Sequence, residues 1–122
     1  MSGRRLELLQ WFGLLGGPAA WATHLVLGFE VTEASCTSGV GPFGAAAWLT
    51  AATVVAAIVV LLAEGAAVTV FRELVGVDKD APGPNGRRRF LVVGAMVANA
   101  LFFVAVVLAG VATVAQPGCR GA

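Results

Sequence analysis

A single histidine lies inside an apolar segment of this sequence, and it is the first candidate for chemistry. His24 stands in the stretch GGPAAWATHLVLGFEVTEASC and is followed by Glu30, Glu33 and Cys36. Imidazole titrates near neutral pH, so a histidine near carboxylates could relay protons. A metal site needs several converging N, O or S ligands, and His24 with Glu30 supplies too few. Glu30 also lies almost opposite His24 around a helix, which disfavours a proton relay between them.

Haem ligation is a second possibility for His24. A haem with two axial ligands needs a partner for this histidine, either Met96 or a residue of another subunit. We therefore expect no cofactor to be bound by this chain alone, and a haem in a partner subunit stays open. The interpretation that the surrounding sequence favours is a hydrogen-bonded packing residue between helices.

The composition predicts the elements that must position these residues. Of the 122 residues, 58% are hydrophobic and 12% are charged, about half the charged fraction of a soluble domain. Three apolar segments cover residues 8–30, 45–71 and 90–115, and each exceeds the roughly 20 residues needed to cross a bilayer. The sequence predicts an all-α integral membrane protein, with three transmembrane helices in a single domain (1–122) and loops at 31–44 and 72–89.

The basic residues predict the orientation of these helices. Only Arg120 follows the third segment, whereas the other basic residues flank the opposite ends of the segments: Arg4, Arg5, Arg72, Lys79, Arg87, Arg88 and Arg89. Cytoplasmic loops carry an excess of Lys and Arg. We expect a cytoplasmic N-terminus and 72–89 loop, an outer C-terminus and 31–44 loop, and a multi-pass location in a bacterial inner membrane. Arg87, Arg88 and Arg89 are expected to attract anionic lipid headgroups. The run from Pro82 to Gly86 predicts an irregular loop.

Small and polar residues predict the helix contacts. One stripe of the first helix holds Gln10, Gly13, Gly17, Trp21, His24 and Gly28, and the third helix carries Asn99. Small residues let helices approach closely, and a polar side chain can hydrogen-bond across the contact. Gly16-Gly17-Pro18 is expected to kink or loosen the first helix. Charged residues remain as candidates for a partner contact or a proton path: Glu30 and Glu33 at the end of the first helix, and Glu64 near the cytoplasmic end of the second.

The segment GPAAWATHLVLGFEVTEASC resembles a known group of proteins. Gly17-Pro18, Trp21, His24, Leu25 and Cys36 are similar to the start of small three-helix bacterial membrane proteins encoded beside haem–copper cytochrome oxidase genes. The resemblance covers the first third of the chain. It implies an accessory subunit of a respiratory, electron-transport complex and brings no catalytic residue with it.

Two function classes follow from this pattern. The leading hypothesis is a structural subunit that stabilises the catalytic core of a larger membrane complex by helix packing, with other membrane subunits and lipids as partners and no nucleic acid. The alternative is a small homo-oligomeric transporter or channel with a polar path through Glu64, Asn99 and His24. No enzyme is expected, because no HExxH, GxSxG or phosphate-binding glycine loop occurs.

The only two cysteines are expected to face the same side of the membrane. Cys36 lies in the predicted outer loop and Cys119 follows the third helix. Disulfides persist on the oxidising side of the membrane, so a Cys36–Cys119 bond is predicted. Two free thiols remain the alternative, because a disulfide also needs a close approach of the two Cα atoms.

Thiol labelling tests this pairing. In the intact protein without reductant, we expect neither Cys36 nor Cys119 to react with a maleimide reagent, and both to react after reduction. Ready labelling of both cysteines before reduction would show two free thiols instead.

Overall fold

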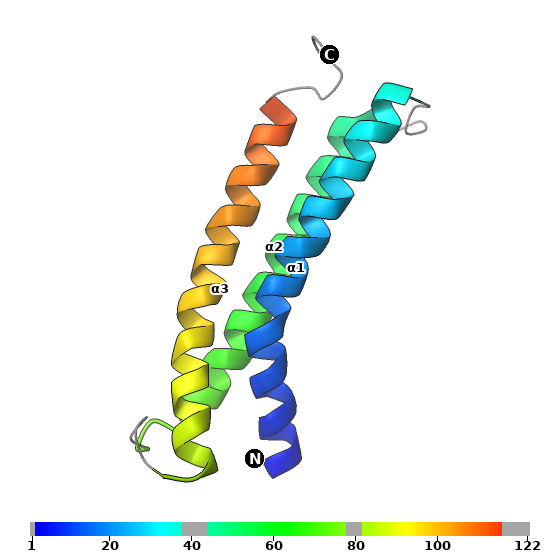
Figure 1. Cartoon of the computed structure of the whole chain (residues 1–122). Coiled ribbons are helices and arrows are strands. Elements are labelled where there is room, and N and C mark those ends of the chain that lie inside the picture. Colours follow the sequence, from blue (N-terminus) through cyan, green and yellow to red (C-terminus); the bar gives the residue numbers. More distant parts are fainter. Residues whose placement is uncertain (1, 38–43, 78–81, 116–122) are drawn as a thin grey trace.

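The computed structural model describes residues 2–37, 44–77 and 82–115, except for the side chains of residues 35–37, 45 and 113–115. Within these ranges the chain forms three α-helices: α1 (Gly3–Thr37), α2 (Gly44–Glu73) and α3 (Pro84–Ala115). All three are long and apolar enough to span a membrane, which confirms the predicted all-helical architecture. The helices run side by side in an up-down-up arrangement, and α1 starts at the end of the bundle where α2 ends and α3 begins (Figure 1).

Each helix extends beyond its predicted apolar segment. Residues 31–37, expected in a loop, continue α1, and α3 begins at Pro84 instead of residue 90. The expectation of an irregular chain through Pro82–Gly86 is therefore wrong from Pro84 onward. Proline is well tolerated at the first helical position, where its missing N–H has no intrahelical partner to lose. Gly83 turns the chain into the helix with a φ of 96°, and its carbonyl accepts a hydrogen bond from the Arg87 N–H at 3.5 Å.

The start and the middle of α1 show two local effects of sequence. Ser2 caps the helix, because its hydroxyl oxygen accepts a hydrogen bond from the Arg5 N–H at 3.3 Å. Pro18 lies inside α1, and the helix continues through it. Proline removes one backbone donor and crowds the preceding turn. The ribbon of α1 changes direction in its N-terminal half, the half that contains Gly16-Gly17-Pro18 (Figure 1).

Two apolar clusters hold the three helices together. The first, which we call the end cluster, lies near the α2–α3 connection and is built on Val70, Leu74 and Val92, with Leu6, Leu9, Phe71, Val77 and Met96 packed around them. The second, the middle cluster, is built on Ala20, Ala56, Val60 and Val106, with Trp21, Ala57, Val59, Phe102 and Phe103 around them. Both clusters contain residues of all three helices. Their buried members are mostly alanine and valine, which keep the helix axes close.

Glycines of α1 make the closest helix approaches. A Cβ atom added to Gly13 would lie 3.0 Å from the Ala67 nitrogen, and one added to Gly16 would lie 2.9 Å from the Ala63 Cβ. At Gly17 an added Cβ would overlap the Asn99 side-chain oxygen. The predicted stripe therefore contacts α2 through Gly13 and α3 through Gly17.

Gly28 differs from the prediction. A Cβ atom at this position would meet no heavy atom of the described residues within 4 Å, so Gly28 makes no close helix contact. The predicted stripe therefore leaves the contact surface between His24, which is buried, and Gly28.

Paired glycine substitutions test the importance of this close approach. Gly17→Ala should destabilise the bundle by about 1–3 kcal/mol, because the new methyl group forces Asn99 out of its place. Gly28→Ala is the matched control and should change the free energy of unfolding by less than about 0.5 kcal/mol. Denaturation in detergent micelles measures both. Equal stability of the two variants would contradict the packing described for Gly17.

Candidate functional site

Asn99 lies at a junction of all three helices. Its side chain is 1% exposed, and its amide nitrogen donates a hydrogen bond to the Gly13 carbonyl of α1 at 2.8 Å. A second side-chain hydrogen bond joins Asn99 to Glu64 of α2. Gly17 provides the space in which the amide sits. We call this set of residues, Asn99, Gly13, Gly17 and Glu64, the Asn99 junction.

His24 lies at a second polar junction, in the half of α1 that leads to Thr37. It is 5% exposed, and its Nε2 atom lies 2.9 Å from the Thr53 hydroxyl oxygen of α2. The Thr53 hydroxyl donates its one proton to the Leu49 carbonyl at 2.8 Å. Thr53 can therefore only accept from His24, which assigns a proton to Nε2; in a neutral ring this is the Nε2–H tautomer. We call His24, Thr53 and Gly110 the His24 junction, because a Cβ atom at Gly110 of α3 would overlap the Thr53 side chain.

The second ring nitrogen of His24, Nδ1, is left without a hydrogen bond to the described residues. Nδ1 is buried and lacks a hydrogen-bond partner among the residues that the structure describes. In the assigned tautomer this nitrogen is an acceptor with a free lone pair. A buried acceptor without a donor is costly, particularly within a membrane. The His24 junction thus keeps one unused hydrogen-bonding position.

The middle cluster separates the two polar junctions. Ala20, Ala56, Val60 and Val106 lie between them and are at most 8% exposed. Trp21 and Phe102 add an aromatic contact to the cluster, with ring centroids 5.6 Å apart. The predicted polar residues Glu64 and Asn99 therefore meet each other, whereas His24 stands apart from both. Within one chain, these residues do not form a continuous polar path.

The remaining candidates are dispersed along the bundle. Glu30 and Glu33 are exposed on α1 and lie inside the helix, not at its end as expected, because α1 extends to Thr37. Met96 packs in the end cluster, whereas His24 bonds Thr53 on the other side of the middle cluster. Met96 and His24 therefore do not converge on one haem. No group of three or more His, Cys, Asp or Glu side chains converges within residues 2–37, 44–77 and 82–115.

Arg89 contacts the end of α2, and its predicted attraction of lipid headgroups stays a prediction. Its guanidinium donates a hydrogen bond to the Leu74 carbonyl at 3.3 Å and lies 4.3 Å from the centre of the Phe71 ring. A cation in this place stabilises the carbonyl end of α2 and stacks on an aromatic face. Arg87 is exposed and Arg88 is half-buried.

The predicted Cys36–Cys119 disulfide lies outside the described residues, because the structure describes neither Cys119 nor the side chain of Cys36.

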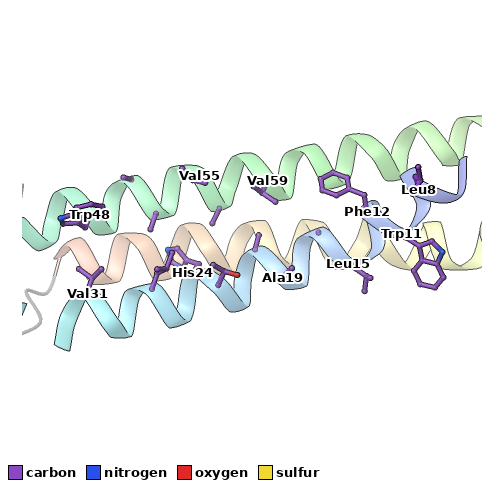
Figure 2. Close-up of a pocket in the computed structure, with 17 residues that line it drawn as sticks. Leu8, Trp11, Phe12, Leu15, Ala19, His24, Val31, Trp48, Val55 and Val59 are labelled. Atoms are coloured by element: carbon purple, nitrogen blue, oxygen red, sulfur yellow. The ribbon is translucent and has the colours of Figure 1, made fainter. Parts of the chain in front are cut away.

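An apolar groove runs along α1 and α2 on the outside of the bundle. It has a volume of about 880 Å³ and follows α1 from Leu8 to Val31, which is about 35 Å of helix. Trp11 and Phe12 lie toward one end and Trp48 toward the other (Figure 2). Between them the groove is lined mainly by small residues: Gly16, Ala19, Ala20, Ala51, Ala52 and Ala56. Polar lining comes from Thr23 and His24.

Comparison with known protein families, characterised proteins and solved structures found no match to this chain.

Thr53 and Gly110 complete the His24 junction, and the sequence did not predict their contact with each other or with His24. The sequence does contain a signal for this contact, in the spacing of the junction residues along each helix. Gly13 and His24 are eleven residues apart on α1, Thr53 and Glu64 on α2, and Asn99 and Gly110 on α3. Eleven residues are about three helical turns, so each pair shares a face and the two junctions lie roughly 16 Å apart. The repeat on all three helices marks both junctions.

Two threonine substitutions test the His24 junction. Thr53→Val keeps the side-chain shape but leaves the His24 Nε2–H without its acceptor, and should cost about 0.6–1.7 kcal/mol of stability. Thr69→Val is the matched control, because the Thr69 hydroxyl only bonds the Gly65 carbonyl of its own helix at 2.8 Å. Unfolding of both variants in one detergent gives the comparison. A Thr69→Val variant as destabilised as Thr53→Val would contradict an interhelical role for Thr53.

Proposed function

We propose that this chain is an accessory subunit of a larger bacterial membrane complex, oxidase-linked and respiratory, and that it stabilises a catalytic core by helix packing. The observation that carries the proposal is the apolar groove between α1 and α2. The link to a respiratory complex rests on the resemblance at Gly17-Pro18, Trp21, His24, Leu25 and Cys36.

The occupant that fits the groove best is a transmembrane helix of a partner subunit. Its length of about 35 Å along α1 is comparable to the thickness of a bilayer's hydrocarbon core, about 30 Å. The glycine and alanine residues in its central part permit the close backbone approach that drives helix association in lipid. His24 lines the groove and its Nδ1 lacks a partner among the described residues, so a partner side chain with an O–H or N–H group would supply a donor at this position.

The arrangement of charges supports the proposed orientation in the inner membrane. Arg4 and Arg5 begin α1, Arg72 lies in the last turn of α2, and Arg87 and Arg88 lie in the first turns of α3. The fold brings these helix ends to one end of the bundle (Figure 1). By the positive-inside rule this end faces the cytoplasm.

The separated polar junctions support a structural subunit over a transport path within a single chain. A polar path through a single chain would have to pass the middle cluster, whose buried side chains are alanine and valine. The two junctions instead hydrogen-bond neighbouring helices, as polar residues do at the contacts of membrane helices.

Purification from native membranes with matched variants tests the proposal. In mild detergent, the wild-type chain should co-purify with haem-containing membrane subunits, identified by mass spectrometry and by the visible spectrum. Ala19→Phe should abolish this association because it fills the groove, whereas Ala100→Phe on α3 should retain it. Both alanines are exposed, so both variants should fold normally.

A wild-type chain that purifies as a lone monomer under these conditions would contradict the proposed function. Association that survives Ala19→Phe and is lost in Ala100→Phe would place the partner on α3 and contradict the role of the groove.

A further inference from the structure

Two buried oxygen atoms in the Asn99 junction lack hydrogen-bond partners. They are Oδ1 of Asn99 and Oε2 of Glu64, and neither has a donor within the described part of the chain. The two side chains are nevertheless hydrogen-bonded to each other. Buried oxygens without a donor are rare in folded proteins, so each of these two atoms needs an explanation.

The atoms available for the Glu64–Asn99 bond can be deduced. Since Oδ1 of Asn99 has no partner, the amide NH₂ group must donate to Glu64. Since Oε2 of Glu64 has no partner, the accepting atom must be Oε1. The amide has two N–H groups, and the other one donates to the Gly13 carbonyl at 2.8 Å. All donors of Asn99 are therefore used.

An ionised Glu64 would leave this arrangement incomplete. A carboxylate only accepts hydrogen bonds, so its Oε2 and the amide Oδ1 would be two acceptors with no donor for either. A protonated carboxyl supplies the missing donor, because an O–H on Oε2 can bond Oδ1. The carboxyl and the amide then form a two-bond pair, with N–H donating to one oxygen and O–H to the other.

We propose that Glu64 is a proton-binding site, which holds a proton at neutral pH and donates it in a hydrogen bond to Asn99 Oδ1. This site is independent of the proposed docking of a partner in the groove, because Glu64 and Asn99 do not line the groove. One bound proton satisfies both orphaned oxygens and removes a net charge from within α2.

The charges around Glu64 support a proton as the ligand. On α2 the nearest cation along the chain is Arg72, about 12 Å farther along the helix. On α3, Arg89 is engaged with Leu74 and Phe71, and on α1, His24 is bonded to Thr53 on the far side of the middle cluster. An unpaired carboxylate within a membrane span is costly, so a proton is the simplest compensation.

Infrared spectroscopy of the full chain in lipid bilayers tests the proposal. At neutral pH, the wild type should show the C=O stretching band of a protonated carboxyl, which shifts in D₂O. Glu64→Gln should lose the band, whereas Glu73→Gln, which changes an exposed carboxylate at the end of α2, should keep it. Absence of the band in the wild type, or its persistence in Glu64→Gln, would overturn the proposal.

Thermal unfolding gives a second readout that does not depend on the infrared band of the carboxyl group. An exposed glutamate is ionised at neutral pH, so the folded chain holds one proton that the unfolded chain releases. The stability of the wild type should therefore fall as pH rises, because the unfolded state binds fewer protons. Glu64→Gln keeps an N–H donor for Asn99 Oδ1 and should fold with a weaker dependence on pH. Identical pH dependence of the two proteins would also overturn the proposal.

Discussion

The hydrogen bond from the Asn99 amide to the Gly13 carbonyl is the interaction on which the bundle depends. Lipid provides no hydrophobic driving force between membrane helices, so close packing and buried polar contacts must hold them together. Asn99 is almost fully buried, and it can reach α1 only because Gly17 has no side chain. The same amide also bonds Glu64, so one side chain joins all three helices.

The rest of the bundle is arranged in layers around this contact. Going from the α2–α3 connection, the end cluster comes first, followed by the Asn99 junction, the middle cluster and the His24 junction. Apolar layers of alanine and valine alternate with polar layers, and each polar layer uses a glycine to admit a larger side chain. Outside the bundle, large apolar residues such as Leu101 and Phe29 are exposed, as a lipid environment requires.

The sequence predicted the helices well and their partners less well. Length and hydropathy fix three spanning segments, and the small-residue stripe of α1 correctly pointed Gly13 and Gly17 at other helices. The helix ends were misjudged, because Pro84 at a first helical position starts a helix and the polar end of α1 remains helical. The His24–Thr53 contact joins residues 29 apart in the chain. Periodicity gives the face of a residue, but the register between two helices depends on packing that a single sequence does not encode locally.

The most direct test of the central interaction is solid-state NMR on the chain in lipid bilayers, with the Asn99 side-chain amide labelled with ¹⁵N and the Gly13 carbonyl with ¹³C. We expect a measurable dipolar coupling between the two labels, because the labelled carbon lies one C=O bond beyond an oxygen that is 2.8 Å from the labelled nitrogen. A spectrum with no measurable coupling, in a sample whose three helices are intact, would contradict it.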